Sequence, residues 1–263
     1  MVNFDLKSRY GYEDLLEVIH LLRSPEGCPW DKEQTHKSIR RGFLEETYEA
    51  VEAIDREDTA LLCEELGDVL MQVVFHADIE SDAGRFTMED VIDGVVKKLV
   101  FRHPHVFATT RADSTEEVLV NWEQLKRQEK GQSTATDTLE SVASTLPQLW
   151  RAEKVQNKAA KAGFDWADVN GALDKLDEET AELRRAVETG GDVADELGDV
   201  LFAAVKVGRF AGVDPEAALS GTCEKFIRRF AAVEKAVLAQ GKSMEDMPLE
   251  ELEQLWNQAK RSS

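Results

Sequence analysis

The chain has 263 residues, of which 42% are hydrophobic and 32% charged, a composition typical of soluble globular proteins. The 52 acidic residues outnumber the 32 lysines and arginines and leave a formal net charge of −20, which argues against nucleic acid as a general partner. The N-terminal segment has no apolar signal region, and no apolar run is long enough to span a membrane. The three cysteines lack the CxxC spacing of a disulfide framework or a cysteine zinc site. We therefore expect a cytoplasmic protein with no membrane partner.

Two long stretches without proline, residues 30–103 and 148–214, predict long helices. Both are rich in Glu, Leu, Ala, Lys and Arg, which favour helix. Apolar residues recur in them at helical spacing, whereas strand-like alternation over more than four residues is hard to find. The sequence therefore predicts an all-α fold.

Residues 128–145 are rich in Ser, Thr, Gly and Gln, which is typical of an exposed connection. This segment separates two predicted units, residues 1–130 and 146–263. Five motifs recur in the same order in both units: a tryptophan, EExxE, ELGDVL, KxxxR and WxxxK. Such a repeat predicts two tandem copies of one helical module.

The acidic motifs place like charges one helical turn apart. Glu46 precedes Glu49 and Glu65 precedes Asp68 in the first copy, and the second copy repeats the pattern with Glu179, Glu182, Glu196 and Asp199. Like-charge pairs at this spacing cost about 0.2–0.5 kcal/mol each when nothing neutralises them. A solvated helix face would explain any one acidic motif, but the repetition of both motifs favours a groove in which four carboxylates meet a cation.

Each ELGDVL motif also contains a glycine, Gly67 or Gly198. Glycine inside a helix costs about 1 kcal/mol relative to alanine. Its presence among the acids indicates the close approach of a ligand or a neighbouring helix, and simple helix crossing is an equally good explanation.

Four carboxylates without histidine or cysteine form a hard oxygen donor set, which suits Mg²⁺ or Mn²⁺ better than zinc. A divalent cation reverses the local charge and lets an acidic protein bind a nucleotide phosphate. Basic pairs one turn apart have the spacing to grip phosphates, although ordinary surface charge is the alternative. They are Lys98 with Arg102 and Lys225 with Arg229.

A tryptophan near the end of each copy is followed by a lysine one turn later. These pairs are Trp122 with Lys126 and Trp256 with Lys260. The indole rings fit either stacking on a nucleobase or packing between helices.

Taken together, the duplicated EExxE and ExxD motifs, GCPWDKEQT at 27–35 and RHPHVF at 102–107 resemble the two-domain MazG nucleoside triphosphate pyrophosphohydrolases. The resemblance covers essentially the whole chain. It implies an all-α NTP-pyrophosphatase fold and a homodimer in which helices of more than one module complete each site. It also implies Mg²⁺-dependent hydrolysis of NTPs and dNTPs between the α- and β-phosphates, which yields NMP and pyrophosphate.

The resemblance also assigns roles to single residues. It implies that the acids Glu46, Glu49, Glu65, Asp68, Glu179, Glu182, Glu196 and Asp199 are metal ligands. The acids considered for orienting or deprotonating the attacking water are Glu45 and Glu178. The implied nucleotide contacts of the second copy are Lys175, Lys225, Arg229, Trp256 and Lys260.

The first copy keeps Lys98, Arg102, Trp122 and Lys126 but has Gly42 in the place of Lys175. In the second copy, Asp192 stands where some relatives have a lysine. In this family hydrolysis is generally assigned to the C-terminal copy, but the sequence leaves open which copy hydrolyses the substrate.

Two other functions remain open. One is a related all-α enzyme restricted to a single nucleotide, such as dUTP, dCTP or phosphoribosyl-ATP. No residue pattern specifies one nucleobase, so broad specificity is the expectation. The other is a non-catalytic acidic helical protein that binds a basic partner, which explains the charge but not the repeated KxxxR pairs. Turnover that depends on Mg²⁺ would distinguish the enzymes from such a binding protein.

Overall fold

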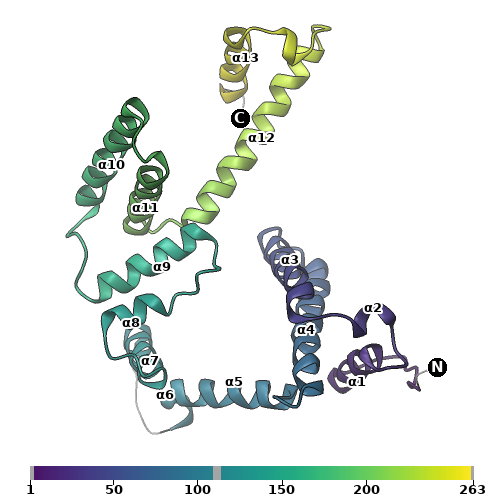
Figure 1. Cartoon of the computed structure of the whole chain (residues 1–263). Helices are drawn as coiled ribbons and strands as arrows, with labels where there is room; N and C mark the ends of the chain where they lie inside the picture. The colour runs from purple at the N-terminus through teal and green to yellow at the C-terminus, as the bar shows by residue number, and fades with distance from the viewer. Residues whose placement is uncertain (1–2, 109–113, 262–263) are drawn as a thin grey trace. The chain divides into compact units, whose positions relative to one another are not determined.

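The computed structural model describes residues 3–108 and 114–261 (Figure 1). These residues form helices and contain no strand, which confirms the predicted all-α fold. None of the helices in the described ranges is both long enough and apolar enough to cross a membrane. The chain divides into two compact units, Met1–Lys126 and Arg127–Ser263.

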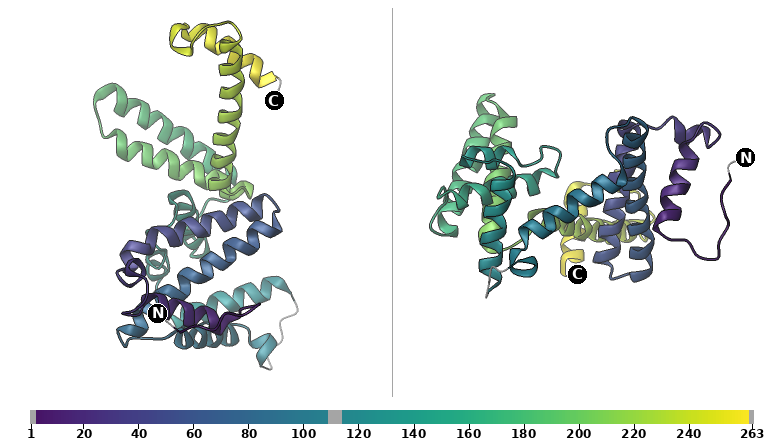
Figure 2. Two further views of the ribbon diagram at one scale, coloured as in Figure 1. Left: turned by 90° about the vertical axis from the view of Figure 1, so that its right-hand side faces the viewer. Right: turned by 90° about the horizontal axis from the view of Figure 1, so that it is seen from below.

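Unit 1 is built around a hairpin of two long helices, α3 (His36–Asp55) and α4 (Thr59–Asp82), which lie side by side in Figures 1 and 2. Its core joins α1 to this hairpin through Ile19, Ile39, Val74 and Phe75. The other helices of the unit are α1 (Tyr12–Arg23), α2 (Pro29–Lys32), α5 (Met88–Arg102), α6 (Pro104–Phe107) and α7 (Thr115–Glu129), which crosses the boundary.

Unit 2 repeats the hairpin with α10 (Val169–Thr189) and α11 (Val193–Ala211). A second hairpin in this unit, α12 (Pro215–Leu238) and α13 (Leu249–Arg261), has a small core of its own around Val233, Val237 and Met247. A 3₁₀ turn, Met244–Asp246, joins α12 to α13, and the unit begins with α8 (Ala135–Glu140) and α9 (Gln148–Lys161).

The turns of the two acidic hairpins are short because aspartates cap the second helices. Asp58 accepts hydrogen bonds from the first backbone N–H groups of α4, and Asp192 does the same for α11 at 3.1 Å. Helix α10 ends at Thr189 and is capped by Gly190, whose φ of 75° is left-handed. A short turn folds the second helix back along the first, so the ELGDVL motif lies opposite EExxE. Asp192 is therefore engaged as the N-terminal cap of α11.

The prediction that residues 128–145 are an exposed connection is wrong in part. Residues Ala135–Glu140 form α8, which packs on α9, and Thr138 and Val142 are buried. Thr134 caps this helix by accepting a hydrogen bond from the backbone N–H of Asp137 at 3.0 Å. The threonine that suggested a loop therefore begins a helix.

An ion-pair network at the end of the first hairpin predicts a pH-dependent contribution to stability. The buried Glu80 on α4 accepts hydrogen bonds from Arg85 and His36, which lower its pKa to about 2. A lowered pKa stabilises the fold above the unfolded pKa of about 4.3 and loses that effect as the pH falls toward 2. We expect Glu80→Gln to lower the Tm at pH 7, with a difference from the parent that shrinks below pH 4.

Thermal unfolding followed by circular dichroism at several pH values checks this expectation. Glu26→Gln, which changes an exposed loop glutamate, is the matched control and leaves the Tm unchanged. A Glu80→Gln deficit that is as large at pH 3 as at pH 7 would show that the carboxylate charge is not the stabilising group.

Candidate functional site

The acidic motifs of unit 1 converge across the hairpin. One carboxylate oxygen from each of Glu46, Glu49 and Glu65 lies within 4.8 Å of the other two. The first two residues come from α3 and the third from α4. Glu65 is buried, Glu46 is half-buried and Glu49 is exposed, so the cluster opens toward solvent on one side. Asp68 lies one turn further along α4 and acts electrostatically on Glu46 and Glu65.

Unit 2 repeats this arrangement. Oxygen atoms of Glu179, Glu182 and Glu196 lie within 4.8 Å of one another, and Glu179 is only 6% exposed. Asp199 lies next to the cluster and shares a pocket lining with Glu179. In each unit the structure thus brings three of the four predicted ligands together and places the fourth beside them.

The two clusters carry negative charge that the protein does not fully neutralise. Burial raises the pKa of Glu46, and the nearby carboxylates of Asp68 and Glu49 raise it further. The pKa values of Glu65 and Glu196 are also raised, first by burial and then by neighbouring acids. Such shifts mean that each site disfavours its own ionised carboxylates, so a divalent cation would stabilise both.

A lysine distinguishes the second cluster from the first. Lys175 Nζ lies 2.6 Å from Glu179 Oε1 and 3.0 Å from Glu178 Oε1, and these two carboxylates raise the pKa of Lys175. In unit 1 Gly42 stands at that position, and Arg41 Nε instead binds Glu45 Oε1 at 2.7 Å. Among the described residues, a lysine or arginine therefore contacts a carboxylate of the second cluster but none of the first.

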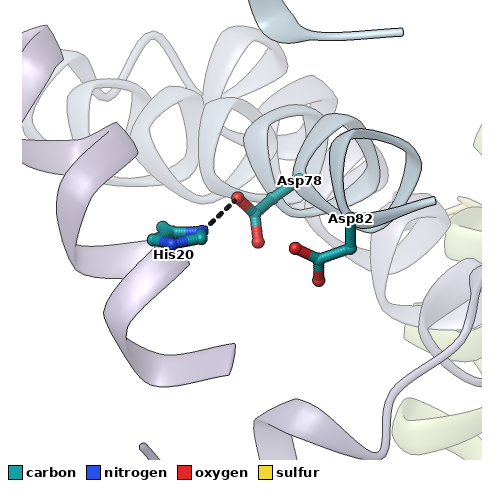
Figure 3. Close-up of side chains that lie close together, drawn as sticks. All are labelled: His20, Asp78 and Asp82. Atoms are coloured by element: carbon teal, nitrogen blue, oxygen red, sulfur yellow. Dashed lines mark hydrogen bonds and ion pairs between the residues drawn. The ribbon is translucent and has the colours of Figure 1, made fainter. Parts of the chain in front are cut away.

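A third group of ligand-type side chains lies on another face of unit 1 (Figure 3). His20 from α1 and Asp78 and Asp82 from α4 have atoms within 4.8 Å of one another. Arg23 Nη1, however, forms ion pairs with both aspartates, at 2.9 Å for Asp82. A guanidinium already neutralises these acids, so the group ties α1 to α4 and does not form a metal site. Its members lie far apart in the chain, so no motif in the sequence predicts it.

Unlike Lys175, the predicted residues Arg102, Trp122, Lys126 and Trp256 make contacts outside the carboxylate clusters. In unit 1 the Arg102 guanidinium and Lys126 Nζ lie 5.2 and 4.6 Å from the centroid of the Trp122 ring. In unit 2 Trp256 packs against the core between α12 and α13 and contacts Phe226, with ring centroids 5.0 Å apart. Within the chain both tryptophans are engaged in packing, and stacking on a base stays a prediction.

Three predicted phosphate contacts of unit 2 form no ion pair with the acidic cluster of the same unit in the described part of the chain. They are Lys225 and Arg229, which lie on α12, and Lys260, which lies on α13.

The glycines of the ELGDVL motifs face open space. A Cβ atom added to Gly67 or Gly198 would meet no atom of the described residues within 4 Å. A helix crossing inside the same unit therefore does not explain either glycine. The neighbouring Leu66 and Leu197 are 54% and 46% exposed, so this open surface continues as an apolar row beside the acids.

The comparisons with known proteins agree with this geometry. The profile of the MazG nucleotide pyrophosphohydrolase domain matches residues 34–107 and 168–233, one acidic hairpin in each. The chain therefore belongs to the MazG family of enzymes, which confirms the resemblance seen in the sequence.

Several relatives match most of the chain. It is 45% identical over 252 residues to the nucleoside triphosphate pyrophosphohydrolase of Escherichia coli K12, covering 94% of this chain and 96% of that one. It is 42% identical over 249 residues to the nucleoside triphosphate pyrophosphohydrolase/pyrophosphatase MazG of Thermotoga maritima, covering 95% of each. YabN of Bacillus subtilis is 48% identical over 256 residues, which are 96% of this chain and 52% of that protein.

The uncompensated charge predicts that removing one acid stabilises the metal-free protein. Because the folded state raises the pKa of Glu65, its ionisation destabilises the fold at neutral pH. A glutamine has the same shape, and its amide donates to the neighbouring carboxylates. We expect Glu65→Gln to raise the Tm in EDTA and to reduce the further rise caused by Mg²⁺.

Thermal unfolding with EDTA and with excess Mg²⁺ measures both effects. Glu64→Gln changes the adjacent exposed glutamate and serves as the matched control, with a smaller change in each condition. A lower Tm of Glu65→Gln in EDTA, or an undiminished response to Mg²⁺, would contradict the electrostatic interpretation.

Proposed function

We propose that the protein is a Mg²⁺-dependent nucleoside triphosphate pyrophosphohydrolase of broad specificity, with Mn²⁺ as an alternative ion. It hydrolyses NTPs and dNTPs between the α- and β-phosphates and releases NMP and pyrophosphate. The observation that carries the proposal is the pair of clusters in which three carboxylate oxygens lie within 4.8 Å, each inside a segment that matches the family profile. Relatives from Escherichia coli and Thermotoga maritima bear the name of this activity.

The donor chemistry fits Mg²⁺. The clusters contain only carboxylates, the hard oxygen ligands that Mg²⁺ and Mn²⁺ prefer. The raised pKa values of Glu46, Glu65 and Glu196 reflect a charge that a divalent ion would offset. The residues that would hold the ions are Glu46, Glu49, Glu65 and Asp68 in unit 1, and Glu179, Glu182, Glu196 and Asp199 in unit 2.

Residues of the chain orient the reactants around these ions. Mg²⁺, when bound, polarises a phosphoryl oxygen and lowers the pKa of a bound water. Glu178 and Glu45 are each more than half exposed, at 57% and 53% of the side chain, and precede the first ligand of their clusters. In this proposal one of these carboxylates accepts a proton from a water at the edge of the cluster. Lys175 adds an ammonium group that donates to a phosphate oxygen.

The active assembly in this proposal is a homodimer. Each unit has an exposed apolar row beside its acids. Leu70, near Gly67, is 39% exposed, and Leu201, near Gly198, is 48% exposed. Phe226 on α12 is 55% exposed. A second copy that covers these apolar surfaces removes them from water. In this proposal it also brings Lys225 and Arg229 to a carboxylate cluster, since no ion pair in the described ranges joins them to the cluster of their own unit.

We assign hydrolysis to the second copy, because it has Lys175 beside its carboxylates. In this assignment, Glu179→Gln removes a buried ligand and lowers kcat by about 100-fold or more, the usual scale for losing a group that stabilises transition-state charge. The equivalent change in the first copy, Glu46→Gln, has a smaller effect. Release of pyrophosphate by the purified variants measures both.

The control for this comparison is Glu188→Gln, at an exposed position near the end of α10, which retains parental activity. A larger loss in Glu46→Gln than in Glu179→Gln would assign hydrolysis to the first copy instead.

A substrate panel tests the reaction and its breadth. We expect pyrophosphate and NMP from every standard NTP and dNTP with Mg²⁺ and none in EDTA. The values of kcat/KM should differ by about tenfold or less among bases. Strong discrimination requires a site whose buried polar groups lose their partners when the wrong base binds, and no residue pattern here specifies one base.

A single nucleotide preferred by more than about 100-fold would identify a narrow enzyme acting on dUTP, dCTP or phosphoribosyl-ATP. Orthophosphate as the product would overturn the assigned bond. No turnover together with no effect of Mg²⁺ would favour the non-catalytic interaction protein.

A further inference from the structure

Unit 1 has a pocket of about 470 Å³ that the proposed hydrolysis does not use. Its walls come from α3, α4 and α5 and from the loop that precedes α5. Phe43 on α3 lies one turn before Glu46, but the acids of the first cluster do not line the pocket. The pocket is therefore a separate place from the first carboxylate cluster.

The walls of this pocket are mainly apolar and aromatic. Phe43 and Phe86 contribute phenyl rings, and the imidazole of His76 lies with its ring centroid 5.5 Å from that of Phe43. No acidic residue of the described ranges lines the pocket, although the chain has a net charge of −20. A cavity of roughly 150 Å³ admits benzene, so this pocket has room for two fused rings.

Arg40 supplies a free positive charge at this pocket. Arg40 is exposed, and no hydrogen bond or ion pair joins it to another residue in the described part of the chain. A guanidinium group binds a carboxylate through two parallel hydrogen bonds. Small-molecule sites combine apolar walls with a few such polar groups, so Arg40 gives the pocket a preference for an anionic ligand.

The two histidines of the pocket do not add a second free charge. His36 Nδ1 lies 2.7 Å from His76 Nδ1, so one ring donates a hydrogen bond to the other. Burial, and to a smaller extent the neighbouring His36, lowers the pKa of His76, so its ring is neutral at pH 7. His36 Nε2 contacts Glu80, which balances any charge on that ring.

This charge count favours a carboxylate over a phosphate. A phosphate monoester carries a charge of about −1.5 to −2 at pH 7, which one guanidinium does not neutralise. A carboxylate carries a single negative charge and fits the planar fork of an arginine.

Unit 2 folds the same hairpin without these polar groups. Apolar residues take the equivalent places in the repeat: Val169 for His36, Leu173 for Arg40 and Val207 for His76. The hairpin therefore does not need the polar side chains in order to form, and their presence is a property of unit 1 alone.

We propose that this pocket binds a small aromatic carboxylate, whose rings pack against Phe43 and Phe86 and whose carboxylate pairs with Arg40. The apolar walls favour the rings by removing them from water. The free guanidinium favours one negative charge at the edge of the pocket. The site belongs to unit 1 and needs no metal ion.

Isothermal titration calorimetry of the full chain in EDTA tests this proposal. The probes are naphthaleneacetate, naphthaleneethanol, which has the same rings without the charge, and acetate, which has the charge without the rings. We expect naphthaleneacetate to bind about tenfold more tightly than naphthaleneethanol, the scale of one charge-assisted hydrogen bond, and acetate to give no measurable binding. Arg40→Gln should bring the two ring ligands to nearly equal affinity, and Phe86→Ala should weaken both several-fold.

Both variants leave the core of unit 1 intact, because Arg40 is exposed and Phe86 is 40% exposed. The matched control is Arg56→Gln, which removes an arginine directly after α3 whose side chain is 63% exposed. This control keeps the parental preference for naphthaleneacetate. Circular dichroism verifies the fold of all three variants.

Four results would overturn the proposal. The first is equal binding of the two ring ligands by the parent, and the second is no binding of either, as when a second copy covers the pocket. The third is an unchanged preference in Arg40→Gln, which would place the carboxylate elsewhere in the chain. The fourth is binding of acetate as tight as that of naphthaleneacetate. Because the assay contains no free divalent metal and measures no turnover, each of these results leaves the proposed hydrolysis standing.

Discussion

The main constraint on the structure is the electrostatic repulsion among the carboxylates that each of the two helical hairpins holds together. Holding Glu65 or Glu196 among other acids raises the pKa of its carboxyl group and so opposes folding at neutral pH. Apolar packing elsewhere offsets this cost. Capped, short turns enforce the arrangement, since Asp58 and Asp192 fix where α4 and α11 begin. A cation would relieve this repulsion, so the energetics of the clusters as well as their donor atoms support the proposed metal sites.

Duplication gave both units the same hairpin, but the surroundings of the acids have diverged. Unit 1 has Phe75 in its core where unit 2 has Lys206, and Gly42 where unit 2 has Lys175. These exchanges turn packed volume into a pocket and add cations beside the second cluster. One fold thus supplies the same proposed metal ligands twice, while different side chains surround the two clusters.

The sequence predicted the helical fold and the acidic clusters because helical spacing and an internal repeat both leave direct traces in it. It misplaced the structure around residues 128–145 because threonines such as Thr134 favour loops and helix caps alike. The pocket in unit 2 left no such trace, since it depends on Trp166 lying on Gly171 and on Lys206 being buried. Contacts between residues outside one regular element appear only when the chain is folded.

Titration with Mn²⁺ followed by electron paramagnetic resonance tests the central claim most directly, because the signal reports the free ion. The account predicts that the parent binds Mn²⁺ at both clusters. Glu65→Gln should lose the binding of the first cluster, Glu196→Gln that of the second, and the double variant both. An unchanged Mn²⁺ affinity and stoichiometry in the double variant would show that these carboxylates are a solvated acidic surface and not metal centres.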